Sequence, residues 1–186
     1  MTPIDLLLSR KSHNKLTSPA PDNDQLEILF KAALRAPDHA LLKPARYRVF
    51  EGDSLARLGD YFVTAALNKE PELPQEKQDK LRGKPLRAPM VIVASAVLKE
   101  HSKVPEVEQI LSVGAGVQNM LMAAHFQGIG AMWRTGGMAY NEKLMELLEF
   151  EAGEMIIGFI YLGTEEGNKR AAKPLEIEEF VTRFGE

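Results

Sequence analysis

Apolar residues recur at helical spacing in five segments of the chain, and this pattern predicts five amphipathic helices. The helices are expected over residues 2–12, 22–36, 53–67, 105–127 and 141–148. The clearest one begins at Asp22, with Gln25 in capping-box spacing, and ends before Pro37, which cannot continue a helix. Gly128 is placed to end the long fourth helix.

Patterns typical of strands lie between these helices. Tyr47 and Val49 alternate with arginines, as in a strand with one buried face. Residues 89–98 and 155–162 are almost continuously apolar, as in central strands buried on both faces, and 131–133 predicts a further short strand. Strands separated by helices predict a layered helix–sheet–helix body, and the length favours a single domain over residues 1–186.

Two segments do not follow either period. Residues 68–85 are rich in charge and proline, with apolar periodicity only around Leu81, so we expect a mobile excursion or lid there. Residues 164–186 are polar and then amphipathic, which indicates a C-terminal arm that could join a neighbour's sheet.

Gly114, Ala115 and Gly116 interrupt the middle of the long helix. An interior glycine costs a helix about 1 kcal/mol relative to alanine, so a close approach is expected at this point. The approaching group could be another helix, a second subunit or a flat ligand, and close helix packing is the favoured interpretation.

Composition excludes several classes of function. The 186 residues include 23 Lys and Arg against 26 Asp and Glu, a net charge of -3 that favours neither nucleic acid nor anionic membranes as partners. There is no cysteine, which excludes disulfides, thiol nucleophiles and thiolate metal sites. The four histidines have no zinc-site spacing, so no metal is expected. The short apolar N-terminus and the lack of a long apolar run predict a soluble, cytoplasmic protein.

Three short motifs bring cations and hydroxyls together. Arg10, Lys11 and Ser12 end the first helix and suit a phosphate or a polyol, although basic residues also stabilise a helix C-terminus by themselves. Arg35 and His39 flank a proline break after the second helix. The third motif joins the sole tryptophan to a cation and a hydroxyl directly after a strand, as Trp133, Arg134 and Thr135. A core tryptophan followed by an ordinary turn would look the same.

These three motifs, in this order, resemble the nitroreductase family of FMN-dependent oxidoreductases, specifically its short members. The likeness runs over essentially the whole chain, including Ala88-Pro89 before the central strand and the late strand ending Tyr161 to Thr164. It implies an α+β nitroreductase fold, with a central mixed sheet flanked by helices in α/β/α layers, and an intertwined homodimer with FMN at two interface sites.

The resemblance also implies roles for residues. Arg10, Lys11 and Ser12 would bind the FMN phosphate, ribityl chain and pyrimidine edge, and Arg35 and His39 would complete the site from the same side. Trp133, Arg134 and Thr135 would come from the other subunit and line the isoalloxazine. Longer members grip the phosphate with a C-terminal basic pair, for which Lys169 and Arg170 are candidates without an assigned role.

The implied activity transfers electrons from NADH or NADPH through FMN to a nitroaromatic, a quinone or a similar small acceptor. No protein nucleophile is needed for this chemistry, so no catalytic side chain is assigned. Two alternatives stay open: a flavin-binding sensor or carrier with negligible turnover, and an interaction domain without a cofactor.

Overall fold

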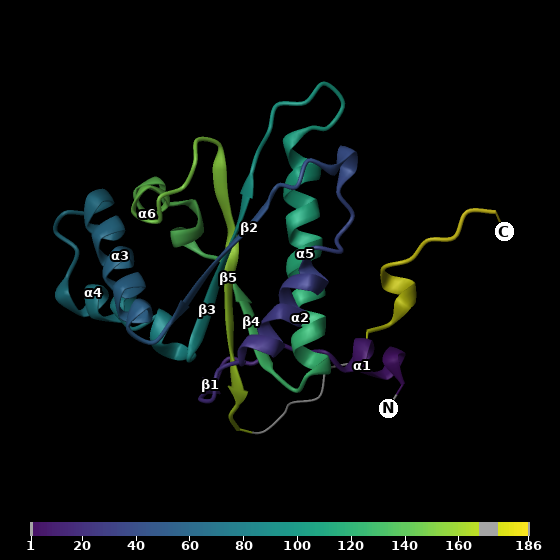
Figure 1. Cartoon of the computed structure of the whole chain (residues 1–186), viewed down its shortest axis with the longest axis horizontal. Helices are drawn as coiled ribbons and strands as arrows, with labels where there is room; N and C mark the ends of the chain where they lie inside the picture. Colours follow the sequence, from purple (N-terminus) through teal and green to yellow (C-terminus); the bar gives the residue numbers. More distant parts are fainter. Residues whose placement is uncertain (1, 168–174, 186) are drawn as a thin grey trace.

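The computed structural model describes residues 2–167 and 175–185 and has a five-stranded sheet between two layers of helices (Figure 1). The strands are β1 (Leu16–Thr17), β2 (Ala45–Glu51), β3 (Met90–Val97), β4 (Gly130–Arg134) and β5 (Glu154–Glu165). The helices are α1 (Pro3–Ser9), α2 (Asn23–Ala33), α3 (Asp53–Lys69), α4 (Gln75–Arg82), α5 (Glu106–Phe126) and α6 (Glu142–Leu147). Four 3₁₀ turns complete the described elements: η1 (His39–Leu41), η2 (Pro85–Arg87), η3 (Gly137–Tyr140) and η4 (Ile177–Glu179).

The pairings among the described strands are all antiparallel, which corrects the expected mixed sheet. β3 and β4 do run in the same direction, as a strand–helix–strand unit around α5 predicts. However, β5 lies between them and is antiparallel to both. β5, the last strand in the sequence, therefore separates β3 from β4 and prevents a parallel pairing between them.

Side chains of β3 and β5 alternate between two cores because successive residues of a strand point to opposite faces. Ile92 and Ile160 pack with buried residues of α2 and α5, whereas Val93 and Phe159 pack with those of α3 and α6. Every residue of β3 is buried, as its nearly continuous apolar run predicts. Figure 1 shows α2 and α5 on one side of the sheet and α3, α4 and α6 on the other.

The packing of α5 against α2 explains one of the two glycines in the middle of the long helix. A Cβ at Gly116 would lie 2.9 Å from the carbonyl oxygen of Ala33 and 2.9 Å from the Tyr47 hydroxyl. Residue 116 must therefore be small for the end of α2 to pack here. A Cβ at Gly114 would make only an ordinary contact, 3.9 Å from the Trp133 ring. The favoured interpretation, close helix packing, holds at Gly116.

Residues 68–85 contain α4, a helix that the apolar pattern did not predict. None of its residues is buried, so it has no apolar stripe that periodicity could detect. It is attached through its end: Arg82 donates to Asp60 at 2.9 Å, and Gly59 of α3 lies against the Arg82 carbonyl.

The other predicted elements are present. β5 begins at Glu154 and continues to Glu165, and residues 16–17 form an additional short strand beside its end. No helix among the described residues is long and apolar enough to cross a membrane.

Candidate functional site

A cavity of about 380 Å³ opens at the C-terminal end of β4. Its wall is formed by the sheet, by the segment around η2 and by the start of η3. The residues that line it are Phe62, Lys84, Arg87, Met132, Trp133, Arg134, Thr135, Gly136, Met138, Phe159 and Tyr161. This volume is within the range of small-molecule and cofactor sites.

Strand alternation decides which side chains reach this cavity. Met132 lies opposite Tyr161 and Arg134 opposite Phe159 in the β4–β5 register, so all four point to the same face of the sheet. Trp133 lies between them, and its indole is on the α5 face, where its N–H donates to the Ile157 carbonyl at 3.2 Å. The indole occupies the space that a side chain at residue 158 would fill, because Gly158 has none.

Three positively charged side chains line the cavity. Lys84, Arg87 and Arg134 all line it, and none of its lining residues is a carboxylate. The guanidinium of Arg134 lies over the Tyr161 ring, 5.5 Å from its centroid, and its buried Nε has no hydrogen-bond partner among the residues that the structure describes. Burial, followed by the nearby charge of Arg87, lowers the pKa of Lys84. Because buried polar groups are normally paired, this arrangement suits an anionic ligand with several acceptor atoms.

Tyr161 supplies an aromatic wall to the same cavity. Its side chain is 4% exposed, and burial raises the pKa of its hydroxyl against the opposing effect of Arg134 and Arg87. The phenol therefore stays neutral near pH 7, and its buried ring supports the Arg134 guanidinium in the wall of the cavity.

Of the residues expected at the site, one group lies at the start of the strand that ends in the cavity. Arg10 ends α1, and three residues later His13 donates its backbone N–H to the Ala131 carbonyl of β4 at 2.9 Å. Lys11 is half-buried and Ser12 is exposed. The segment 10–12 therefore lies near the start of β4, the strand whose other end carries Arg134.

The other group lies at the opposite end of α5. His39 Nδ1 is 2.6 Å from Glu108 Oε2, near the beginning of α5, whereas Ser9 Oγ is 3.1 Å from His125 Nε2, near its end. These contacts are 17 residues apart, and at about 1.5 Å per residue the separation is roughly 25 Å. Arg35 directly follows α2, which packs along α5 near Gly116. The structure therefore does not place Arg35 and His39 beside Arg10 within one chain, against the expected grouping.

The loop that carries His39 has an unusual backbone. Ala40, Leu41 and Lys43 have φ values of 60°, 53° and 52°, in the left-handed region that residues other than glycine rarely occupy. The Asp38 carboxylate accepts hydrogen bonds from the N–H groups of Leu42 and Lys43 and holds the loop in this form. Backbone strain of this kind is found more often at functional sites than elsewhere in a protein.

Comparison with known proteins places the chain in a family. A model of the nitroreductase family matches residues 7–164. The chain is 34% identical over 187 residues to YdjA of Escherichia coli strain K12, named as a candidate NAD(P)H nitroreductase, across 99% of this chain and 100% of that protein. A similarly named protein of Haemophilus influenzae is 36% identical over 184 residues, across 98% of this chain and 99% of the relative.

The chain belongs to the nitroreductase family. Solved structures agree with this fold. A nitroreductase-like family protein from Bacillus cereus superposes with a TM-score of 0.85 at 22% identity, across 99% of this chain and 96% of that one. A candidate nitroreductase from Desulfovibrio desulfuricans, solved in complex with FMN, has a TM-score of 0.74 at 21% identity, across 98% and 97%.

Within this nitroreductase fold, the sequence did not indicate that Lys84, Arg87 and Tyr161 would line the cavity. Lys84 and Arg87 follow the charge-rich segment and precede the buried strand β3 directly. The sequence feature that could have indicated them is this pair of basic residues shortly before a buried strand. Lys169 and Arg170, the other candidates for an anion contact, lie outside the described residues.

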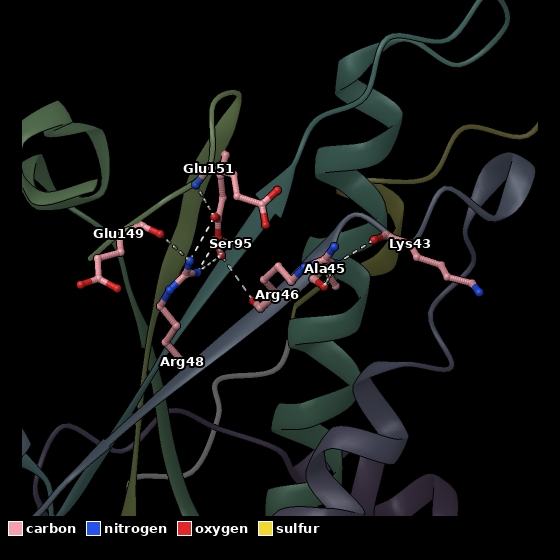
Figure 2. Close-up of polar contacts among 8 residues, drawn as sticks. Lys43, Ala45, Arg46, Arg48, Ser95, Glu149 and Glu151 are labelled. Atoms are coloured by element: carbon pink, nitrogen blue, oxygen red, sulfur yellow. Dashed lines mark hydrogen bonds and ion pairs between the residues drawn. The ribbon is translucent and has the colours of Figure 1, made fainter. Parts of the chain in front are cut away.

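A second buried charge cluster lies on the same face of the sheet, away from the cavity. Figure 2 shows Arg48 of β2 reaching Ser95 and the Glu149 carbonyl; Arg48 also donates to Glu154 Oε2 at 3.1 Å. The guanidinium carbon lies 4.1 Å from the centroid of the Phe150 ring. Burial of Glu154 disfavours its charge, but hydrogen bonds from Arg48, Ser95 and the Glu151 N–H outweigh this effect and lower its pKa. Every charge here has a partner, so the cluster holds β2, β3 and β5 together.

Proposed function

We propose that this nitroreductase-family chain is an FMN-dependent oxidoreductase, which takes electrons from NAD(P)H and passes them to a nitroaromatic, a quinone or a similar small acceptor. The observation that carries the proposal is the cavity with three cations, an orphaned Arg134 Nε and no carboxylate among its lining residues. Relatives support the choice of ligand: the Desulfovibrio protein was solved with FMN, and a Sphingopyxis relative with a TM-score of 0.77 is named as an FMN- and NADPH-dependent nitroreductase.

The residues of the cavity fit a flavin nucleotide. Lys84, Arg87 and Arg134 would hold its anionic and carbonyl groups, Tyr161 would lie along its flat surface, and Arg10, Lys11 and Ser12 would approach it from the start of β4. When bound, FMN supplies the hydride and electron chemistry. The protein's part is to bind and orient the ring and to place positive charge where negative charge develops.

We further propose a homodimer in which Arg35 and His39 complete the site of the second copy. The separation of roughly 25 Å along α5 is too long for one flavin nucleotide to bridge. Large apolar side chains are exposed on α1, at the end of α2 and on α5, including Leu8 at 73%, Leu34 at 67% and Leu111 at 64%. The C-terminal arm exposes more, with Phe180 at 67% and Phe184 at 96%. Patches of this kind are typical of protein interfaces.

Four measurements test the proposal. Purified protein should carry FMN, visible by its absorbance, and saturating FMN should raise the melting temperature of stripped protein. Anaerobic NADPH or NADH should bleach the flavin, and a nitroaromatic or quinone should restore its colour. Light scattering should give the mass of two chains.

The alternatives have distinct outcomes. A flavin that binds but is not bleached by either nucleotide would indicate the sensor or carrier. A protein that does not bind FMN would indicate the interaction domain without a cofactor. A single-chain mass in the flavin-bound state would contradict the shared site.

A further inference from the structure

A second, larger hollow adjoins the cation-lined cavity. It has a volume of about 900 Å³ and lies between the C-terminal end of α3 and the segment from η3 into α6, and we call it the α3–η3 groove. Met138 lines both hollows, and the neighbouring Gly136 and Gly137 line the cavity and the groove respectively. Resting on the function proposed above, we propose that this groove binds the adenosine diphosphate half of the nicotinamide dinucleotide that reduces the flavin.

Two consecutive glycines, Gly136 and Gly137, lie where the two hollows adjoin. A Cβ at Gly136 or at Gly137 would meet no atom within 4 Å, so close packing does not require glycine at either position. Gly136 has a φ of 81°, which explains its identity, but Gly137 does not have a positive φ. Gly137 therefore adds no side chain to the turn at which the cavity and the groove adjoin, and an extended ligand could lie along this turn.

The walls of the groove carry the groups that a nucleotide needs. Tyr140 is 71% exposed, a large aromatic surface that no neighbouring side chain covers and on which a base can stack. Asn68 and Lys69 at the end of α3 add an exposed amide and an exposed cation. Lysine is a common point-charge ligand of phosphate, and an amide can donate to and accept from a base.

The charges of the groove leave Lys69 as its available cation. Lys143 Nζ is held by Glu146 Oε1 at 2.7 Å, whereas Lys69 forms no ion pair with any of the described residues. Of the two carboxylates in the groove, Glu70 lies 3.8 Å from Lys77, and Glu142 is in the first turn of α6, where the helix N-terminus offsets a negative charge. A diphosphate beside Lys69 would therefore meet one free positive charge.

The dinucleotide is favoured over a small acceptor by size and by polarity. A nitroaromatic or a quinone needs only the space over the flavin ring, whereas the groove extends well beyond the cavity and adds amide and charged side chains to an apolar lining. A dinucleotide whose nicotinamide lies over the flavin ring and whose diphosphate and second base extend into the adjoining groove fits this arrangement.

The test uses FMN-loaded protein and ADP-ribose, which contains the adenosine diphosphate half but no nicotinamide. Calorimetry should detect binding to the wild type, and Lys69→Ala and Tyr140→Leu should each weaken it about 5–10-fold, as expected for the loss of a contact worth about 1–1.4 kcal/mol. Lys80→Ala is the matched control, because Lys80 is exposed on α4 and its one ion pair within the described part of the chain is with Glu76. It should leave the affinity unchanged.

Kinetics separate this inference from the proposed function. The same variants should raise the KM for NADH or NADPH and leave unchanged the rate with 1-benzyl-1,4-dihydronicotinamide, which lacks the adenosine half. ADP-ribose that does not bind, or that binds all variants equally, would overturn the inference while flavin bleaching still supports the oxidoreductase. A raised KM for the acceptor alone would assign the groove to the acceptor and also overturn it. A protein that does not bind FMN would contradict both the inference about the groove and the proposed oxidoreductase function.

Lys69 could instead act only on its helix, since a lysine in the last turn stabilises a helix C-terminus. In that case Lys69→Ala would lower the urea midpoint and leave ADP-ribose binding unchanged, and Lys69→Arg would restore the midpoint. That result contradicts the proposed role.

Discussion

Arg48 and Arg134 both project from the sheet toward the side of α3 and α6, and both contact an aromatic ring. Arg48 is matched by the Glu154 carboxylate, by Ser95 and by a backbone carbonyl. Arg134 has a buried Nε without a partner, and its charged neighbours in the cavity, Lys84 and Arg87, are also cations. Unpaired buried charge is expensive, so a fold that keeps it generally has a ligand to match it. We therefore expect Arg48 to hold the structure together and Arg134 to bind an anionic ligand.

The largest effect on stability is expected at the matched cluster. Glu154→Ala leaves the Arg48 guanidinium partly buried without its carboxylate, and should lower the free energy of unfolding by about 2–4 kcal/mol. Urea denaturation measures this loss, and FMN titration of the folded variant should give the wild-type affinity. An unchanged urea midpoint would show that the pair does not hold the sheet together.

At the unmatched site the expected effect falls on binding instead. Arg134→Ala should weaken FMN binding by about 1.5–3 kcal/mol, roughly 10- to 150-fold, because a hydrogen bond from a charged donor is lost. The apo variant should be no less stable than wild type, since the orphaned group is removed with the side chain. A lowered urea midpoint with normal FMN affinity would assign Arg134 a structural role like that of Arg48.

The pH dependence of stability should also distinguish the two arginines. The pKa of Glu154 in the folded protein lies below its ordinary value of 4.5, so its contribution is complete above pH 4.5 and is lost as the pH falls through the folded pKa. The stability difference between wild type and Glu154→Gln should therefore shrink as the pH is lowered below 4.5. Urea midpoints of both proteins across this range measure it, and a constant difference would exclude ionisation as its source.

The smallest effect is expected at a buried polar group without charge. The Tyr47 hydroxyl is buried without a partner, and burial raises its pKa to about 12. Tyr47→Phe removes an unsatisfied group and keeps the ring packed against Phe30, so stability should stay the same or rise by up to about 1 kcal/mol. A clear loss in urea denaturation would reveal a hydrogen bond that the fold needs.

The sequence by itself determined most of the elements. The continuous apolar run of 89–98 became the fully buried β3, and the capping box at Asp22 and Gln25 became the start of α2. Both signals are local, because burial on two faces and the capping of free N–H groups leave a mark within a few residues. α4 escaped prediction because a helix with no buried residue leaves no apolar stripe.

Tertiary structure alone decided the antiparallel sheet and the composition of the cavity. The place of β5 between β3 and β4 depends on pairing between segments distant in the sequence, which no local pattern encodes. The same pairing puts Tyr161 beside Arg134, and chain packing brings Lys84 to them. The ordered motifs identified the family. They did not show that α5 separates Arg10 from His39, because that distance is set by the length of the helix whose two ends contact Ser9 and His39.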